Sequence, residues 1–243
     1  VIHVYISNGE NADEALIYLK ERLSASKIAY SVQKTTVDDE NWNENWKKYF
    51  KAFKVGSRLA VCPSWETYDN KDNRKVISLD PGAAFGTGAH ATTYLCLKML
   101  EDIVNGNSRV LDIGTGSGIL AIASCLLGAQ SAVGVDIDEL AVKTAKGNAA
   151  ANGVDGLTGF FVGDLADKVS GRYNVVCANI VADVVMRLFI NIADYMTDDG
   201  YLLVSGIRDL RAKEVEESAK AHGFKIIKAP VREEWHAYLL KKE

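Results

Sequence analysis

Cysteine is scarce in this chain of 243 residues, and its four copies lie far apart, at positions 62, 96, 125 and 177. They form no C-x-x-C pair, and most of their neighbours are apolar. This spacing argues against a zinc site and against a disulfide framework. We therefore expect four buried, reduced thiols and no bound metal.

The sequence also lacks any apolar run of the roughly 18 residues that a membrane span needs, and it has no basic N-terminal region followed by a cleavage site. Its formal net charge is −4, whereas nucleic-acid-binding domains usually carry a basic stripe. We expect a cytoplasmic, monomeric protein that binds a small molecule or another protein, with no membrane and no direct nucleic-acid contact.

An initiating methionine is absent, since the chain begins with Val1 and its first methionine is Met99. We expect a fragment or a processed product. Residues 1–37 have the pattern of a strand, a helix and a strand. A unit this small, below about 40 residues, is rarely stable alone. We therefore expect 1–37 to be part of a small substrate-recognition domain whose first half precedes Val1.

The next segment, residues 38–54, opens with acids and ends with lysines, as a helix dipole prefers. Its aromatic side chains follow helical spacing. We expect a linker helix packed on the following domain; a recognition stripe for a protein partner is the alternative.

Residues 55–243 alternate between segments typical of strands and segments typical of helices. Expected strands are 109–113, 132–138, 157–164, 174–180 and 201–207, and expected helices are 119–129, 139–152, 183–196 and 210–222. This alternation predicts an α/β domain with a doubly wound, mostly parallel, Rossmann-like sheet. Two final strand-like segments, 224–231 and 235–242, predict an antiparallel edge hairpin. Segments 58–65 and 74–79 flank a polar turn and predict another hairpin.

The most informative motif is VLDIGTGSG, at residues 110–118. It joins an apolar strand to an apolar helix through Gly114, Gly116 and Gly118, where missing side chains allow positive φ and close approach of a ligand. Asp136 ends the next apolar run, beside that loop, where a carboxylate can accept hydrogen bonds from ribose hydroxyls. The pattern predicts a pocket for a nucleoside-like ligand.

The same loop also satisfies the dinucleotide pattern G-x-G-x-x-G/A through Gly116, Gly118 and Ala121. Asp112 favours S-adenosylmethionine instead, because a carboxylate suits the ammonium and sulfonium charges of this ligand and would repel the phosphates of a dinucleotide. We predict an S-adenosylmethionine pocket. A dehydrogenase pocket and a plain α/β core are the alternatives.

A second ligand segment is DPGAAFGTGAHATT, at residues 80–93, just before an apolar helix. Thr92 or Thr93 at the helix start offers a hydroxyl and free backbone N–H groups, which suit a carboxylate such as that of S-adenosylmethionine. A structural glycine turn with an ordinary N-cap is the alternative. For His90, a position lining the pocket and a structural role both stay open.

The third segment is Asn179-Ile180-Val181-Ala182, at the expected carboxyl end of a strand. An asparagine carbonyl can orient an amine while its NH2 group is tied to the backbone, so we expect Asn179 to be the catalytic positioning residue. A buried asparagine that satisfies a loop is the alternative. Asp164 is a weaker candidate for the adenine amino group, since an acid at a strand end is equally often a helix cap.

Together these segments resemble the PrmA-type methyltransferases, which modify the eleventh protein of the large ribosomal subunit. The resemblance runs from about Asp39 to the end, and DPGAAFGTGAHATT is its most specific part. It implies a ferredoxin-like substrate domain for 1–37, a linker helix for 38–54 and a catalytic domain for 55–243. The expected cofactor contacts are Phe85, Gly86, Thr87, Thr93, Asp112, Gly114, Gly116, Asp136, Asp164 and Asn179.

The resemblance implies transfer of methyl groups from S-adenosylmethionine to lysine ε-amines and to an N-terminal α-amine of that ribosomal protein, with Asn179 facing the amine. Ala91 stands where the family often has proline, which we expect to change the stiffness of the loop. Two alternatives stay open: a methyltransferase acting on a small molecule or RNA, and a truncated cofactor-binding module without turnover.

Overall fold

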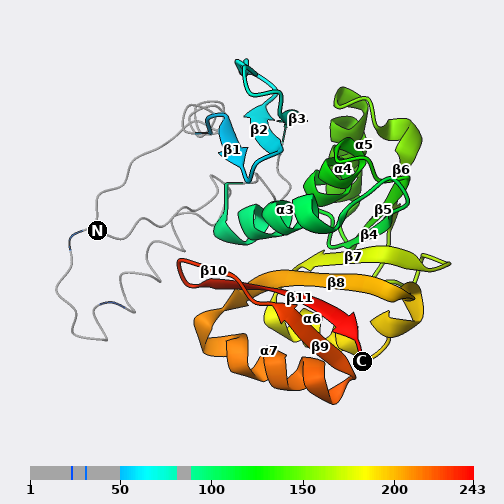
Figure 1. Ribbon diagram of the computed structural model, residues 1–243. Helices are drawn as coiled ribbons and strands as arrows, with labels where there is room; N and C mark the ends of the chain where they lie inside the picture. The colour runs from blue at the N-terminus through cyan, green and yellow to red at the C-terminus, as the bar shows by residue number, and fades with distance from the viewer. Residues whose placement is uncertain (1–22, 24–30, 32–49, 81–88) are drawn as a thin grey trace. The chain divides into compact units, whose positions relative to one another are not determined.

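The computed structural model describes residues 23, 31, 50–80 and 89–243, which are coloured in Figure 1. The chain divides into two units, Val1–Trp46 and Lys47–Glu243. This boundary falls inside the predicted linker segment. The expected elements of 1–37 and most of 38–54 lie outside the described residues, and the account below concerns the second unit.

The larger sheet of this unit has the strand order β10-β11-β8-β7-β4-β5-β6, with β9 also paired to β11. Its strands are β4 (Arg109–Ile113), β5 (Ser131–Asp136), β6 (Thr158–Val162), β7 (Tyr173–Asn179), β8 (Met196–Arg208), β9 (Phe224–Lys228), β10 (Val231–Arg232) and β11 (Trp235–Lys242). Strands β4 to β8 pair in parallel, and β11 pairs antiparallel with β8, β9 and β10. The predicted mostly parallel sheet is confirmed.

Helices cover both faces of this sheet (Figure 1). Helices α3 (Ala91–Ile103), α4 (Ile119–Leu126) and α5 (Glu139–Ala151) lie on one face, and α6 (Ala182–Phe189) and α7 (Asp209–Ala221) lie on the other. The 3-10 turns η2 (Asp155–Leu157) and η3 (Ile192–Tyr195) precede β6 and β8. The predicted helix 183–196 is therefore too long, since the chain leaves the helix at Phe189 and enters β8 at Met196.

Alternation along β4 divides its side chains between these two faces. Leu111 and Ile113 are buried in the core cluster that includes Val185 of α6 and Val215 of α7. Because successive strand residues point to opposite faces, Asp112 lies on the face covered by α3, α4 and α5. The strand thus buries apolar atoms on one side and a carboxyl group on the other.

A smaller sheet joins β1 (Phe53–Val55), β2 (Leu59–Pro63) and β3 (Lys75–Leu79). The hairpin predicted from segments 58–65 and 74–79 is wrong, because β2 and β3 pair in parallel. After β2, the chain therefore returns to the edge of the sheet where β2 began, and β3 starts there. The guanidinium of Arg74 fixes this return by donating Nη1–H bonds to the carbonyls of Val55, Gly56 and Leu59, at 3.1, 3.0 and 2.9 Å.

The predicted linker helix also extends too far. Phe53 and Lys54 belong to β1, where they pair antiparallel with Val61 and Ala60. Backbone pairing with β2 overrides the helical spacing of the aromatic residues at this end of the segment. Phe50, just before β1, is buried with its ring centroid 6.0 Å from that of Trp65.

The C-terminal strands are antiparallel, as predicted, but their order differs from an edge hairpin. Strand β11 lies inside the sheet, between β8 on one side and β9 and β10 on the other. The predicted strand 224–231 is split into β9 and β10 around Pro230. This residue has no N–H to give to a ladder, although its carbonyl accepts a bond from Ala237 N at 3.0 Å.

Helix α3 connects the two sheets. Near its C-terminal end, the Glu101 carboxylate accepts hydrogen bonds from the backbone N–H groups of Ser57, Arg58 and Leu59, at 2.8, 2.7 and 2.8 Å. These three donors lie at the turn between β1 and β2. One side chain therefore fixes that end of α3 to the smaller sheet.

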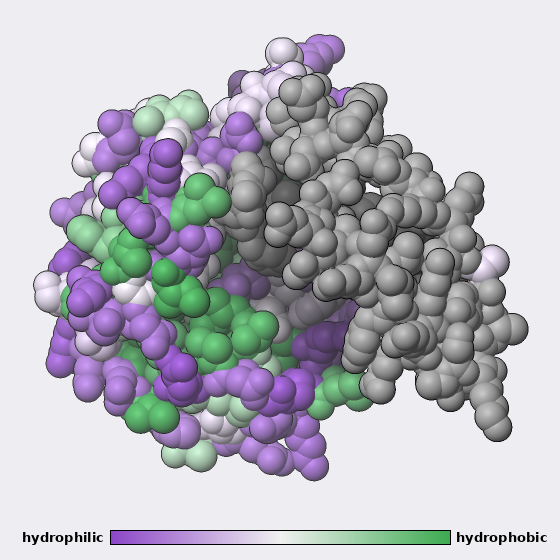
Figure 2. Space-filling view, turned by 180° about the vertical axis from the view of Figure 1, so that it is seen from behind, coloured by the Kyte–Doolittle hydropathy of each residue, from purple (hydrophilic) through white to green (hydrophobic). Residues whose placement is uncertain are grey.

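All four cysteines are buried and free, which confirms the predicted reduced thiols. Within the part of the chain that the structure describes, no helix is both long and apolar enough to cross a membrane. Figure 2 shows hydrophilic residues over much of the described surface seen from behind, with a group of hydrophobic residues among them. In the same part, no three histidine, cysteine or acidic side chains gather as metal ligands.

Candidate functional site

The candidate site lies at the carboxyl ends of the parallel strands. Strand β4 has β5 on one side and β7 on the other, so the strand order reverses at β4. In open α/β sheets, ligands bind in the crevice beyond such a switch point. Two of the three sequence motifs, the glycine loop after β4 and Asn179 at the end of β7, meet at this edge.

The glycine loop is folded over the end of β5 by backbone hydrogen bonds. Gly114 N and Thr115 N both donate to Val135 O, at 2.8 and 3.0 Å. Gly116 N donates to Asp136 Oδ2 at 2.8 Å. The two parts of the first motif, separated in the sequence by a helix, thus form one hydrogen-bonded unit.

Positive φ angles explain why this loop needs glycine. Gly114, Gly116 and Gly118 have φ values of 69°, 53° and 82°. A Cβ atom at Gly114 would also overlap the side chain of Ile180, the residue after Asn179. The bare backbone at Gly114 is therefore needed for conformation and for close packing of the β4 and β7 ends.

Both oxygens of the Asp136 carboxylate are oriented by backbone groups. Oδ2 accepts from Gly116 N, and Oδ1 accepts from Asp138 N at 3.1 Å. The residue is only partly buried, and each carboxylate oxygen can accept more than one hydrogen bond. The arrangement suits a ligand that presents hydroxyl donors to the end of β5.

Asp112 lies deeper than the sequence reasoning implied. Asp112 is only 1% exposed, and Thr115 Oγ1 donates a hydrogen bond to Asp112 Oδ2 at 2.7 Å. Oδ1 is buried, and the described residues give it no hydrogen bond. Burial raises the pKa of Asp112 to about 6, against the lowering effect of the Thr115 hydrogen bond. Its contact with a bound ligand stays a prediction.

Asn179 and Thr93 are joined directly. Asn179 Nδ2 donates to Thr93 Oγ1 at 3.2 Å, which links the end of β7 to the third residue of α3. The expected partner of this NH2 group was backbone, and the structure gives it a side chain instead. Because the NH2 group is held by Thr93, the Oδ1 carbonyl is oriented as a hydrogen-bond acceptor at the carboxyl edge.

The N-cap of α3 is His90, not one of the threonines. His90 Nδ1 accepts from Thr92 N at 3.4 Å and lies 2.9 Å from Thr92 Oγ1. Thr92 and Thr93 are buried within the first turn. The two threonines thus lie at the helix start, as predicted, while the imidazole takes the capping position; their contact with a carboxylate stays a prediction.

Trp235 is a residue of the site that the sequence reasoning missed. Its ring lies edge-on to that of His90, with centroids 4.8 Å apart and planes at 70°. The Arg208 guanidinium carbon lies 5.9 Å from the Trp235 ring centroid. An aromatic wall from β11 thus stands beside the start of α3. No local pattern signals this role, because Trp235 and His90 are far apart in the sequence.

The remaining predicted contacts are not brought into this cluster by the described residues. The Asp164 carboxylate accepts from Arg187 Nη2 at 2.7 Å and is largely exposed. Phe85, Gly86 and Thr87 lie outside the described residues. All four stay predictions.

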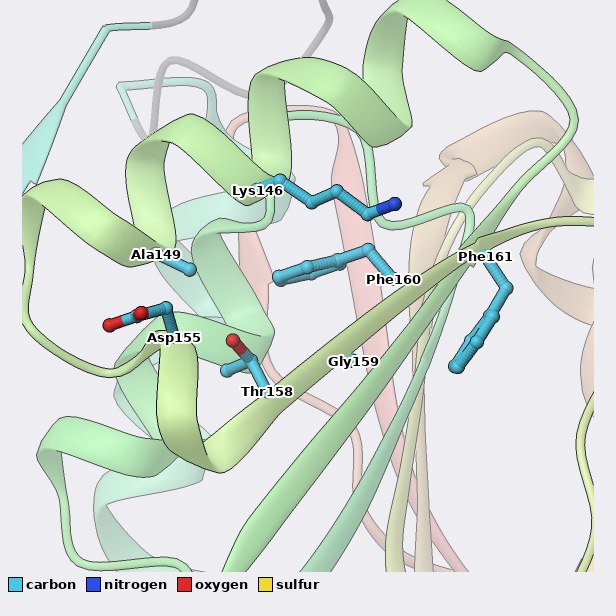
Figure 3. Close-up of a pocket in the computed structure, with 7 residues that line it drawn as sticks. All are labelled: Lys146, Ala149, Asp155, Thr158, Gly159, Phe160 and Phe161. Atoms are coloured by element: carbon cyan, nitrogen blue, oxygen red, sulfur yellow. The ribbon is translucent and has the colours of Figure 1, made fainter.

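A separate cavity of about 260 Å³ lies between α5 and β6 (Figure 3). Phe160 points into the space beside Lys146 and Ala149, whereas Phe161 points to the other side of the strand. The cavity reaches η2, which precedes β6, and therefore opens toward the amino end of that strand. This is the edge opposite the glycine loop, so we do not assign it to the candidate site. Its lining residues are Lys146, Ala149, Asp155, Thr158, Gly159, Phe160 and Phe161.

A family model described as ribosomal protein L11 methyltransferase (PrmA) matches residues 1–243 of this chain. The chain belongs to this family. A ribosomal protein L11 methyltransferase from Desulforamulus reducens is 42% identical over 241 residues, which cover 98% of this chain and 78% of the relative. One from Caldanaerobacter subterraneus is 43% identical over 232 residues, which cover 93% and 74%.

A solved structure of a ribosomal protein L11 methylase from Lactobacillus delbrueckii superimposes with a TM-score of 0.75 at 31% identity, covering 79% of this chain and 99% of that one. A methyltransferase from Thiobacillus denitrificans, solved with S-adenosyl-L-homocysteine, gives a TM-score of 0.52 at 17% identity over 63% of this chain and 93% of its own, and shows the fold alone.

Membership of the L11 methyltransferase family confirms the predicted resemblance, the methyltransferase class and S-adenosylmethionine as the cofactor. The described residues fit that ligand. The glycines of the loop adopt positive φ and place no side chain at this edge, and Asp136 presents an oriented carboxylate beside them. Family membership, and not this geometry, excludes the dinucleotide alternative.

Proposed function

We propose that this chain N-methylates ribosomal protein L11, at lysine ε-amines and at the N-terminal α-amine. The hydrogen bond from Asn179 to Thr93 carries the proposal, because it orients a carbonyl acceptor at the carboxyl edge in a member of the L11 methyltransferase family. The names of the relatives support ribosomal protein L11 as the substrate.

In this proposal the residues at the glycine loop hold the cofactor. Asp136 would accept the ribose hydroxyls, and the backbone at Gly114 and Gly116 would line the ligand. Thr93 would contact the methionine end from α3. Asp112, beneath the loop, would place negative charge under the positively charged part of the ligand. Phe85, Gly86, Thr87 and Asp164 complete the proposed set of contacts.

Bound S-adenosylmethionine supplies an electrophilic methyl group on a sulfonium. The task left to the chain is to present a neutral amine in line with it. For a lysine of pKa about 10.4, deprotonation at pH 7 costs roughly 4.6 kcal/mol, whereas an α-amine of pKa about 7.8 costs about 1 kcal/mol. Desolvation of the amine in the site would lower this cost by disfavouring its charged form.

Asn179 would then position the amine. Its Oδ1 accepts an N–H of the incoming amine, which leaves the nitrogen lone pair free to point at the methyl group. We propose catalysis by such positioning, with no dedicated general base. Asn179 would also border the bound cofactor.

The proposed organisation follows the sequence reasoning. Residues 1–37 would recognise the protein substrate, 38–54 would link it, and 55–243 would carry the chemistry, with the helical part of the linker ending before β1. The chain would act as a monomer in the cytoplasm without contacting RNA. Size-exclusion chromatography with light scattering tests the monomer, and a dimer mass would contradict it.

The decisive experiment incubates the chain with methyl-labelled S-adenosylmethionine and separated ribosomal components. We expect label on protein L11, and mass spectrometry of its peptides should assign the label to lysines and to the N-terminus. Label on RNA or on small molecules, with none on protein, would contradict the proposal. Binding of cofactor without any transfer would favour a module without turnover.

A further inference from the structure

Two of the most exposed large apolar side chains lie at the starts of α6 and α7, the helices that follow β7 and β8. Val181 is 62% exposed and Leu210 is 91% exposed. We call these two residues the apolar rim. Val181 is the N-cap of α6, two residues after Asn179, and Leu210 is in the first turn of α7.

Contacts between adjacent strands hold both members of the rim at one edge of the sheet. Ile180 N donates to Ser205 O at 3.1 Å, so the chain entering α6 lies beside the end of β8, which enters α7. The Arg211 guanidinium then joins the two helix starts, with Nη2 at 2.6 Å and Nη1 at 3.4 Å from the two oxygens of Asp183. This ion pair ties together the helix starts that carry Val181 and Leu210.

Both arginines around the rim are already paired with carboxylates. Arg211 pairs with Asp183 and also with Glu214 at 2.7 Å, and Arg208 pairs with Glu234 at 2.5 Å. A charged side chain of a partner would therefore gain little from these arginines. An apolar side chain would gain from covering Val181 and Leu210.

We propose that the apolar rim binds apolar side chains of the protein substrate that flank the acceptor amine. This inference rests on the proposed function. An amine reaches Asn179 at the end of a flexible side chain or at a chain terminus, so the neighbouring residues of the substrate remain outside the site, over its border. There they meet Val181 and Leu210. The rim thus selects amines in an apolar sequence context.

The test compares steady-state kinetics of methyl transfer to isolated ribosomal protein L11 for three double variants. In Val181→Ser with Leu210→Ser, we expect KM for L11 to rise about 10-fold, with kcat and S-adenosylhomocysteine affinity unchanged. Val181→Ile with Leu210→Met keeps the apolar surface and should keep KM. The matched control is Ile190→Ser with Leu157→Ser, because Ile190 is also 62% exposed but lies at the other end of α6, and Leu157 is 44% exposed in η2. This control should also keep KM.

Each other result is decisive. A KM within twofold of the parent chain in the rim variant, an equal rise in the control, or an equal loss of S-adenosylhomocysteine affinity would overturn the rim as a substrate contact, while transfer to L11 by the parent chain upholds the proposed function. If the parent chain places no label on L11, the proposed function is overturned and the inference with it.

Discussion

The two halves of the candidate site are built in different ways. The half that would hold the methyl donor comes from one continuous stretch, residues 110–136, and works through backbone geometry and Asp136. The half that would receive the amine comes from three separate segments, the start of α3 with His90 and Thr93, the end of β7 with Asn179 and the start of β11 with Trp235, and works through side chains that meet. A local sequence motif can therefore predict the donor half. The acceptor half forms only when the sheet brings distant segments together, so no local motif predicts it.

The largest effect is expected from Gly114→Val, because Gly114 belongs to the donor half and lies against Ile180, the residue after Asn179 of the acceptor half. Valine at a φ of 69° is strained, and its side chain would overlap Ile180 next to Asn179. We expect S-adenosylhomocysteine affinity, measured by calorimetry, to fall about 1,000-fold, or roughly 4 kcal/mol. Gly147→Ala in α5 is the control, because a Cβ there meets nothing within 4 Å. Unchanged affinity in Gly114→Val would contradict the proposal that the backbone at Gly114 lines the bound ligand.

Removing the side chain at Asn179 should affect turnover more than donor binding. We expect Asn179→Ala to lower kcat about 100-fold, because the amine loses its fixed orientation, while S-adenosylhomocysteine affinity changes less than tenfold. Thr93→Val, which removes the partner of Nδ2 and the proposed contact with the methionine end, should lower kcat less, and Thr93→Ser should nearly restore it. An Asn179→Ala chain that binds donor and keeps full turnover would refute positioning by this residue.

The buried carboxyl group of Asp112, in the donor half, predicts that the free energy of unfolding depends on pH. Burial raises its folded-state pKa to about 6, above the ordinary value of 3.8. Its favourable contribution to the free energy of unfolding is therefore complete below about pH 4 and is lost as pH rises through about 6. Urea unfolding should show this loss, about 3 kcal/mol, in the parent chain and in an exposed control, Asp199→Asn, but not in Asp112→Asn. Parallel pH curves for all three would show that Asp112 does not titrate in this way.

The smallest effect is expected at Asp136, which is partly open to solvent. Asp136→Ala removes the tie to Gly116 N and the proposed ribose contact, so we expect about a tenfold loss of S-adenosylhomocysteine affinity, roughly 1.4 kcal/mol. Asp138→Ala is the control, since Asp138 caps α5 through Leu140 N at 2.8 Å. It should lose about 1 kcal/mol of stability with affinity intact. Equal affinity losses in both variants would assign the effect to the loop and not to the ligand contact.

The sequence predicted best where local chemistry decides the structure. Strand β4 has the expected bounds, and the three glycines of its loop have the positive φ that the motif implies. The predictions failed where partners distant in the sequence decide. Strands β2 and β3 pair in parallel, with Arg74 bound to carbonyls of β1 and β2, and Trp235 reaches His90 because β11 pairs with β8.

Helix α3 has a mechanical consequence for the acceptor half. The helix has 13 residues and is therefore about 20 Å long. Glu101 clamps its far end to the β1–β2 turn through three hydrogen bonds, while Thr93 lies near its other end. A rod clamped in this way converts a small rotation of the three-stranded sheet into a displacement of Thr93, and with it of the Asn179 amide. Alignment at the methylation site therefore depends on a carboxylate most of a helix length away.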